Sequence, residues 1–330
     1  MIKLLRHISS RVSFLVLLLV NLASCQKFTV GSGGDVVRLS FACPVIQATQ
    51  ESKALIPGDN FPNSHEAYPI GFWLMNQDTD VPQIDGFDNL KSSYSVVGGE
   101  GRWLFYPFRD NQSQGDLYIR KGLPVDVYAY HPWVEDAESL TSIPFVSGQD
   151  DWMVAGPVSL NRLQTLTDAS VTMPFQHIMT CIQVMIKCKY SGSITLTSMT
   201  LTDTKKRLVA EGTFNCRTKE IQGEKVGDIT VSPQLSISNS SWYSAYIIMP
   251  EVKDLQEGEL KLSFKFNGKD AETSFPIPAK MKLSGNTEVT IDKLSTGYKY
   301  VFMLELDNTT KFVPVGIETM WTTVNVEMPI

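Results

Sequence analysis

Acidic residues, histidines and cysteines are the side chains whose types could support catalysis or metal binding, so their spacing is informative. Asp150 and Asp151 could serve as the carboxylate pair of a glycoside hydrolase or as calcium ligands. Adjacent residues of an extended chain point to opposite faces, which suits a shared acid–base site poorly. His177 and Cys181 are four residues apart, so they could bind one metal ion only on a helix. Thr180 and the β-branched residues around it favour a strand there instead.

Motifs for catalysis and cofactor binding are absent from the sequence. The chain has no GxSxG, no HExxH, and no CxxC or HxxxH spacing. Gly31 to Gly34 have no strand-to-helix context, so they are interpreted as a linker rather than a phosphate-binding loop. His131, which precedes Pro132, is interpreted as a turn residue, and His177 as a structural histidine beside an apolar strand. We expect no enzymatic activity, no bound metal and no cofactor.

The first 25 residues predict export. Three basic residues precede an apolar run from Val12 to Val20, an order typical of a secretory signal peptide. The run is shorter than the ~20 residues that a membrane-spanning helix needs. Residues 22–25, Leu-Ala-Ser-Cys, resemble a bacterial lipobox, which implies cleavage before Cys25 and lipidation of that residue. Several acyl chains on one residue would anchor the protein stably, and the alternative is an ordinary signal peptide.

Length and charge limit the possible partners. Residues 1–24 contain three basic and no acidic residues, so the remaining 306 residues carry 26 basic and 35 acidic ones, a net charge of -9. This balance argues against binding nucleic acid or anionic lipid. A chain of this length usually holds more than one core, so two domains are expected.

Four cysteines remain after Cys25. An even number in an exported protein permits two disulfides, but so few in some 300 residues do not form a disulfide framework. Because each lies in an apolar, strand-like context, we favour buried thiols, which pack as small hydrophobic groups. The four are Cys43, Cys181, Cys188 and Cys216.

Apolar and polar residues alternate along much of the chain, the period of half-buried strands. The first such run places Val37, Leu39, Phe41 and Cys43 on one face. Turn signals at Asp85-Gly86, Gly98-Gly99 and Asn111 to Gly115 separate further short β-type runs, a spacing typical of an all-β sandwich. No helical pattern longer than two turns occurs after the signal peptide.

The second half gives more specific expectations. Residues 182–188 and 194–201 should form a strand and its returning neighbour, with a bulge where the alternation changes phase. Residues 260–266 should end in a tight type I′ turn at Asn267-Gly268. The more continuously apolar segment 242–249 should be a central strand.

Five segments, in this order, resemble the fimbrillin-like lipoproteins of Bacteroidetes, the subunits of type V pili. They are a strand ending Tyr-Ala-Tyr-x-Pro, an acidic-Met-x-Ala segment, a Phe-x-His that leads into an alternating strand, an alternating aromatic run and a C-terminal Trp. Their positions are 123–133, 150–155, 175–186, 297–304 and 317–321.

The resemblance implies an all-β protein of two tandem β-sandwich domains, transthyretin-like and of Greek-key type, after a lipoprotein signal peptide. The expected division is a signal peptide at 1–24, a lipidated tether at 25–35, an N-terminal sandwich at 36–165 and a C-terminal sandwich at 166–330. The boundary would lie between Asn161 and Ser170, or after Lys189.

The resemblance also implies a lipid-anchored structural or adhesive pilus subunit, joined to other subunits, itself or its paralogues, by β-strand addition. We expect the donor strand within 312–330, whose β-type residues are Phe312, Val313, Val315, Val324 and Val326. That segment could instead complete the second sandwich. An acceptor groove would open if the strand 36–43 were removed, and Arg38 offers a trypsin-like cleavage site. The expected location is the outer membrane, held by lipid. Whether it faces the periplasm or the medium stays open, because Gln26-Lys27-Phe28 follow Cys25 instead of acidic residues.

The alternative function is a surface lipoprotein that binds glycans for polysaccharide uptake. It requires an exposed aromatic platform, because sugar rings stack on aromatic faces. The candidate residues are Trp103, Tyr128, Tyr130 and Trp133. In a sandwich of this size, such aromatic residues are more often part of the core or its rim. In a pilus subunit, the partners are other subunits and surface ligands instead.

Overall fold

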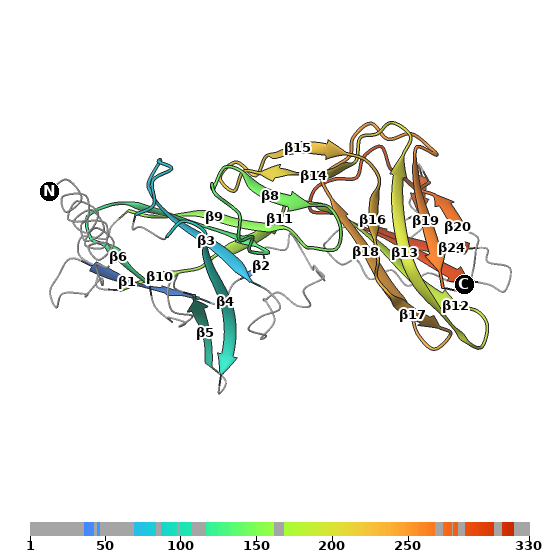
Figure 1. The fold of residues 1–330 in the computed structure, drawn as a ribbon, viewed down its shortest axis with the longest axis horizontal. Coiled ribbons are helices and arrows are strands. Elements are labelled where there is room, and N and C mark those ends of the chain that lie inside the picture. The colour runs from blue at the N-terminus through green and yellow to red at the C-terminus, as the bar shows by residue number, and fades with distance from the viewer. Residues whose placement is uncertain are drawn as a thin grey trace, which may run out of the picture. The chain divides into compact units, whose positions relative to one another are not determined.

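A computed structural model describes residues 36–42, 45–46, 69–83, 87–97, 100–106, 117–161, 168–267, 273–278, 280–282, 288–306 and 312–319 (Figure 1). In these ranges every regular element is a strand, which confirms the all-β prediction. The described residues all belong to one compact unit. The signal peptide, Cys25, Cys43, Val324 and Val326 lie outside the described residues.

Two sheets enclose the first core. The smaller has the order β10-β1-β6 and comprises β10 (Asp168–Val171), β1 (Val36–Phe41) and β6 (Leu117–Arg120). The larger has the order β2-β11-β9-β7-β3-β4-β5: β2 (Val45–Ile46), β11 (Pro174–His177), β9 (Met153–Leu160), β7 (Val125–His131), β3 (Ile70–Asn76), β4 (Leu90–Val97) and β5 (Glu100–Phe105). Side chains from both sheets meet in one cluster, which we call the first sandwich.

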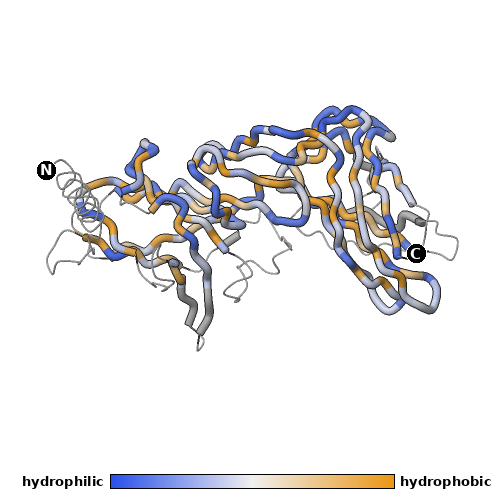
Figure 2. The backbone as a smooth tube through the Cα atoms, in the orientation of Figure 1, coloured by the Kyte–Doolittle hydropathy of each residue, from blue (hydrophilic) through white to orange (hydrophobic). Residues whose placement is uncertain are grey.

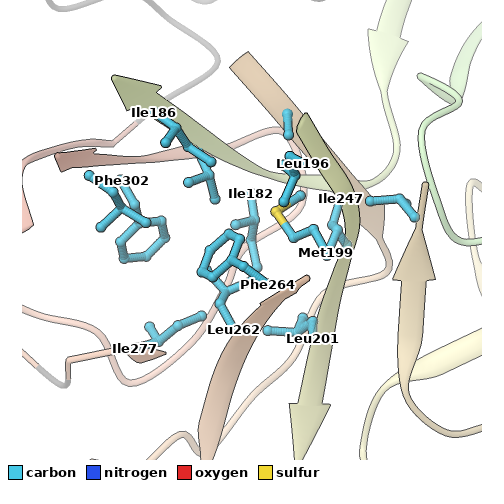
Figure 3. Close-up of a cluster of buried hydrophobic side chains, with 14 of the residues drawn as sticks. Ile182, Ile186, Leu196, Met199, Leu201, Ile247, Leu262, Phe264, Ile277 and Phe302 are labelled. Carbon is cyan, nitrogen blue, oxygen red and sulfur yellow. The ribbon is translucent and has the colours of Figure 1, made fainter. Parts of the chain in front are cut away.

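A second pair of sheets encloses the second core. One comprises, in order, β18 (Tyr243–Met249), β12 (Thr180–Cys188), β23 (Lys299–Leu306) and β24 (Phe312–Thr319). The other comprises β16 (Ile229–Val231), β13 (Ser193–Asp203), β19 (Leu260–Phe266) and β20 (Thr273–Pro276), and β17 (Leu235–Ser238) also pairs with β13. Figure 3 shows their aliphatic and Phe side chains pointing toward one another. We call this the second sandwich. A separate two-stranded ribbon holds β21 (Lys280–Lys282) and β22 (Glu288–Thr290).

A third core arises because the seven-stranded sheet is covered on both faces. Val125, Val127 and Ala129 of β7 enter the first core, while Tyr128 and Tyr130 on the opposite face enter the third. The cover is a sheet of β15 (Ile221–Val226), β14 (Val209–Phe214) and β8 (Ile143–Val146), which lie side by side in Figure 1. Side chains therefore alternate between two cores along β7, and both faces of the strand are buried.

We call the β14–β15 hairpin, residues 209–226, the clasp. It follows β13 of the second sandwich, yet β14 pairs with β8 of the first half of the chain. Its turn extends this contact: the Cys216 amide donates to Leu140 O, and Arg217 Nη2 donates to Thr79 O at 2.7 Å. The clasp thus attaches a segment of the second half to the first.

Several local predictions are confirmed. Ile182, Val184 and Ile186 are buried on one face of β12, and the register of β13 shifts between Leu196 and Ser198, where a bulge was expected. Figure 2 shows apolar and polar residues alternating along these strands. Cys181, Cys188 and Cys216 are buried thiols, as favoured, and form no disulfide among the described residues.

Three predictions of strand pairing were wrong: the neighbour of β12, the turn after β19 and the place of residues 242–249 in their sheet. The strand that returns after β12 does not pair with it, because β13 belongs to the opposite sheet. β19 and β20 do form a hairpin, but Phe264 faces Thr273, two residues beyond the register of a tight Asn267-Gly268 turn. The Asn267 amide donates to Thr195 O instead, so the pairing of β19 with β13 continues to the first residue of the expected turn.

β18 is an edge strand rather than a central one. It pairs with β12 on one side, and its other edge meets Gly148 in a bridge at Ile248. Its apolar character has a different cause: Ile247 faces the second core and Ile248 the third. A strand buried on both faces is continuously apolar whether or not it is central.

The strands β10 and β11 lie after residue 165, the expected domain boundary, but their partners belong to the first sandwich. β10 pairs with β1, and β11 pairs with β2 and β9. The next strand, β12, begins the sheets of the second sandwich at Thr180. The sheets therefore change membership between His177 and Thr180.

Candidate strand-exchange site

β1 lies in the middle of its three-stranded sheet, hydrogen-bonded on both sides. It runs parallel to β10, with Arg38 opposite Asp168, and antiparallel to β6, with Leu39 opposite Leu117. Val37 and Leu39 have no exposed surface. Removing β1 would therefore leave two unpaired strand edges and an apolar slot between them, which is the template that strand addition requires.

The aromatic end of the slot is built around Phe41. Its ring packs edge-on against Phe72 and Trp103, with ring centroids 5.1 and 6.2 Å away. Just beyond it, the Ala42 amide donates to Val171 O at 2.9 Å, and Trp103 Nε1 donates to Ala42 O at 2.8 Å. The C-terminal end of β1 is thus the more firmly held end.

Arg38, the predicted cleavage site, is exposed on the outer face of β1. Cleavage after Arg38 would separate Val36, Val37 and Arg38 from the chain, and Leu39 to Phe41 would remain attached to the loop that follows. Only one of the two fully buried side chains of β1 would be lost. Complete opening of the slot then also requires Leu39 and Phe41 to leave it.

The described part of the expected donor segment is β24. It pairs antiparallel with β23 along its length, with Phe312 opposite Leu306 and Val313 opposite Glu305, and forms the edge of the four-stranded sheet. Pro314 is acceptable there because an edge strand has one side on which the missing N–H is not needed. Residues 312–319 therefore complete the second sandwich within this chain, while 320–330 lie beyond the described residues.

The residues considered for catalysis form a buried structural cluster. Asp151 Oδ1 and His177 Nδ1 are 2.8 Å apart, and both side chains are nearly inaccessible. Asp150 is exposed, so the two carboxylates face opposite ways as predicted. Burial raises the pKa of the Cys181 thiol, which disfavours the reactive thiolate. These groups offer no accessible nucleophile.

His131 is held neutral by its surroundings. Burial lowers its pKa to about 4, against the opposing influence of its hydrogen bond to Pro69 O. Because a carbonyl oxygen only accepts, Nδ1 carries the proton and donates at 2.9 Å. Within the described ranges no group of His, Cys, Asp and Glu could hold a metal ion, and no helix there has the length and apolarity to cross a membrane.

The aromatic platform needed for glycan binding is buried. Trp103, Tyr128 and Tyr130 are at most 2 % exposed. Trp133 is partly buried; its Nε1 donates to Asn89 O, and Lys91 Nζ lies 4.4 Å from the centre of its ring. Three of the four candidates therefore serve as core residues and cannot present a flat face to a sugar.

Sequence reasoning missed the clasp and the cavity beside it. A usable signal was present in Gly212 and Gly223, which face each other across the hairpin. A side chain at Gly212 would lie 2.2 Å from Gln222 O and about 3.1 Å from the Phe145 ring. Glycine is required there by this close approach, but nothing in the pattern identified Phe145 as the neighbour.

Comparison with known proteins agrees with this architecture. Three solved structures share the fold: proposed cell adhesion proteins from Bacteroides uniformis, Bacteroides ovatus and Bacteroides fragilis, 14%, 17% and 12% identical, each with a TM-score of 0.52. The matches cover 87%, 88% and 90% of this chain and 99%, 98% and 100% of those proteins. No curated protein matches the chain. The model of the family described as fimbrillin-like matches residues 63–325, most of the sequence, and the protein therefore belongs to the fimbrillin-like family.

Proposed function

We propose that this protein is a structural or adhesive subunit of a cell-surface pilus, and that its first sandwich accepts a strand from a neighbouring subunit in place of β1. Membership of the fimbrillin-like family supports the general role. The observation that carries the mechanism is the position of β1. It is a central strand between β6 and β10, close to the N-terminal end of the described chain. A strand from another chain can occupy that place without rearranging the core.

The donor that we propose is the C-terminal segment 312–330, and within it residues 320–330. Val324, Val326 and Met328 alternate with Asn325 and Glu327. The same pattern occurs in β1, where Val37, Leu39 and Phe41 alternate with Arg38 and Ser40. A donor with this period would place three apolar side chains in the slot and two polar ones in water.

The proposed location follows from the same function. A pilus subunit works at the cell surface, and lipid on Cys25 would hold the protein at the outer membrane. An anchor or tip subunit would keep Cys25 and β1 together, because cleavage after Arg38 separates the lipid from the sandwich. A shaft subunit would lose Cys25 and the first three residues of β1 by that cleavage, and Leu39 to Phe41 would then leave the slot. The other partners are pilus subunits and the surface ligands of the fibre, and no catalysis is involved.

The test is a strand-replacement experiment on purified protein. Limited digestion with trypsin, mapped by mass spectrometry, should cut after Arg38, and the cut chain should bind a fluorescent peptide of residues 320–330. The uncut chain and an Arg38→Gln chain should bind at least tenfold more weakly. A peptide carrying Val324→Asp and Val326→Asp is the matched control and should not bind.

A peptide of residues 36–41 reports whether the slot itself is open. If the cut chain binds this peptide but not residues 320–330 or 312–330, the donor assignment is wrong. If the cut chain binds none of them, β1 is not exchangeable and the acceptor mechanism is wrong. In cells, deletion of residues 320–330, which leaves β24 in place, should abolish the ladder of heat-labile, high-mass species that assembled subunits give on an unboiled gel.

A further inference from the structure

A cavity of about 510 Å³ lies beside the clasp, away from the slot that β1 fills. One wall is the sheet formed by β8, β14 and β15; the others are the segment after β7 and the residues just before β9. The lining residues are Pro132, Trp133, Val134, Asp136, Pro144, Phe145, Val146, Asp150, Trp152, Glu211, Gly212 and Glu224. Strand exchange at β1 does not use this cavity, although its lining includes Trp133, one of the residues considered for glycan binding.

The charges around the cavity have one sign. Asp136, Asp150, Glu211 and Glu224 line it, and no Lys, Arg or His does. Lys225 neutralises one of the four through its ion pair with Glu211. Three carboxylates from three separate segments remain without an ion-pair partner in the described chain. Such a cavity favours a cation.

The remaining lining suits an apolar stem. Phe145 and Trp152 are almost fully buried and form rigid walls with their rings 6.2 Å apart, while Val146 is 60% exposed at the rim. The Nε1 of Trp152 has no hydrogen-bond partner among the described residues. Carboxylates above aromatic and aliphatic walls match a side chain with an apolar stem and a cationic end, as in Lys and Arg.

β15 provides a place for the backbone of such a partner. Only β14 pairs with it in the described chain, so its outer edge has no strand partner there. Five of its six residues are exposed, and Val226 is 58% exposed. Glu224, on this strand, lines the cavity. A strand added to that edge would lie about 4.8 Å from β15, so a long side chain on it would reach the side of the cavity formed by Glu224.

We propose that this cavity is a binding site for a Lys or Arg side chain of a partner protein whose extended segment adds to the outer edge of β15. The cavity supplies specificity for the cation, and the backbone of β15 supplies the remaining hydrogen bonds. The site is independent of strand exchange at β1, so one subunit can be assembled in a fibre and hold this partner at the same time.

The test uses the full-length protein and a fluorescent peptide of alternating Val and Arg residues, followed by fluorescence anisotropy. Two matched peptides separate the contributions: one with citrulline, which is neutral, in place of Arg, and one with N-methylated backbone on alternate residues, which cannot join a strand edge. Both should bind at least tenfold more weakly than the Arg peptide.

Protein variants locate the site. Asp150→Asn combined with Glu224→Gln keeps the shape and removes two charges, and it should weaken binding of the Arg peptide at least tenfold. Glu138→Gln combined with Glu257→Gln, which are exposed residues outside the cavity, is the control for net charge and should leave binding within twofold of the unmodified protein.

Two outcomes would overturn the proposal. One is equal weakening by both double variants, which would mean that only net charge attracts the peptide. The other is binding of oligomeric glucosamine in the cavity at lower concentration than the Arg peptide, which would assign the site to an amino sugar. The site is supported if the Asp150→Asn, Glu224→Gln variant no longer binds the Arg peptide but, after cleavage at Arg38, still binds the peptide of residues 320–330. Strand exchange would then be unaffected.

Discussion

The two sandwiches differ in how each is completed. In the first, β1 is the middle strand of the small sheet, and its parallel partner β10 lies some 130 residues away in sequence. In the second, four long strands make one sheet, and its central strands β12 and β23 pair over eight residue positions. A sheet that depends on one short terminal strand can exchange that strand at little cost to the rest. A sheet of long internal strands cannot.

Removal of β1 is the test of this difference with the largest expected effect on stability. Deleting residues 36–41 removes two fully buried aliphatic side chains and much of Phe41, a loss of about 5 to 8 kcal/mol at 1.5–3 kcal/mol for each side chain. Hydrogen exchange should show loss of amide protection in β6 and β10, while β13 and β19 keep theirs. Equal loss in both sandwiches would mean that they unfold as one unit.

A smaller perturbation asks the same question without deleting a strand. Leu39→Ala should destabilise the first sandwich by about 3 kcal/mol, because a fully buried leucine leaves a cavity. Leu262→Ala is the matched change in the second sandwich, where Leu262 is also fully buried.

Denaturation followed by hydrogen exchange separates the effects of the two alanine variants. Leu39→Ala should weaken the protection of β6 and β10, and Leu262→Ala that of β13 and β19. Indistinguishable protection maps would contradict the distinction between the sandwiches.

Acid should destabilise the first half of the chain through protonation of His131. The pKa of His131 in the folded protein, about 4, lies below the unfolded value of about 6.5. The unfolded chain therefore takes up a proton first, and the stability present above pH 6.5 falls as the pH drops toward 4. From pH 7 to pH 5 the loss is about 2 kcal/mol.

The His131→Asn variant tests the source of this acid sensitivity. It keeps a donor for Pro69 O and should flatten the dependence of the unfolding midpoint on pH between 5 and 7. An unchanged slope in urea denaturation would assign the acid sensitivity to another group.

The smallest effect concerns the turn of the clasp. Asp80 is 67% exposed in its ion pair with Arg217, and exposed pairs contribute ~0–1 kcal/mol. Asp80→Asn should change the unfolding free energy by less than about 0.5 kcal/mol, measured in urea at moderate salt. A larger loss would mean that the turn of the clasp, rather than the third core, couples the two sandwiches.

Sequence patterns predicted which residues face inward but not which strands are neighbours. The alternation in residues 182–188 identified the buried face of β12, since a period of two follows from the backbone alone. It could not place β13 in the opposite sheet, because the choice of partner depends on contacts across the core. Likewise, Tyr128 and Tyr130 were candidates for an exposed platform only in the glycan-binding alternative, and the sequence did not show that their burial depends on a hairpin some 80 residues later.

The candidate sites were predictable to different degrees. Val37, Leu39 and Arg38 fall within one short segment, so the expected strand and its inward face were visible in the sequence. The cavity was not visible, because its carboxylates come from segments around residues 136, 150, 211 and 224, which only the fold brings together. Sites within one strand can be predicted from periodicity, and sites built from several loops cannot.

The clasp also constrains how subunits of this kind can diversify. Recombination between related genes exchanges contiguous stretches of sequence. A crossover between His177 and Thr180 would join a β8 from one parent to a β14 from the other, and the ring of Phe145 would meet a residue 212 selected against a different neighbour. Chimaeras should therefore be viable only when the residues that face each other across β8 and β14 are inherited together.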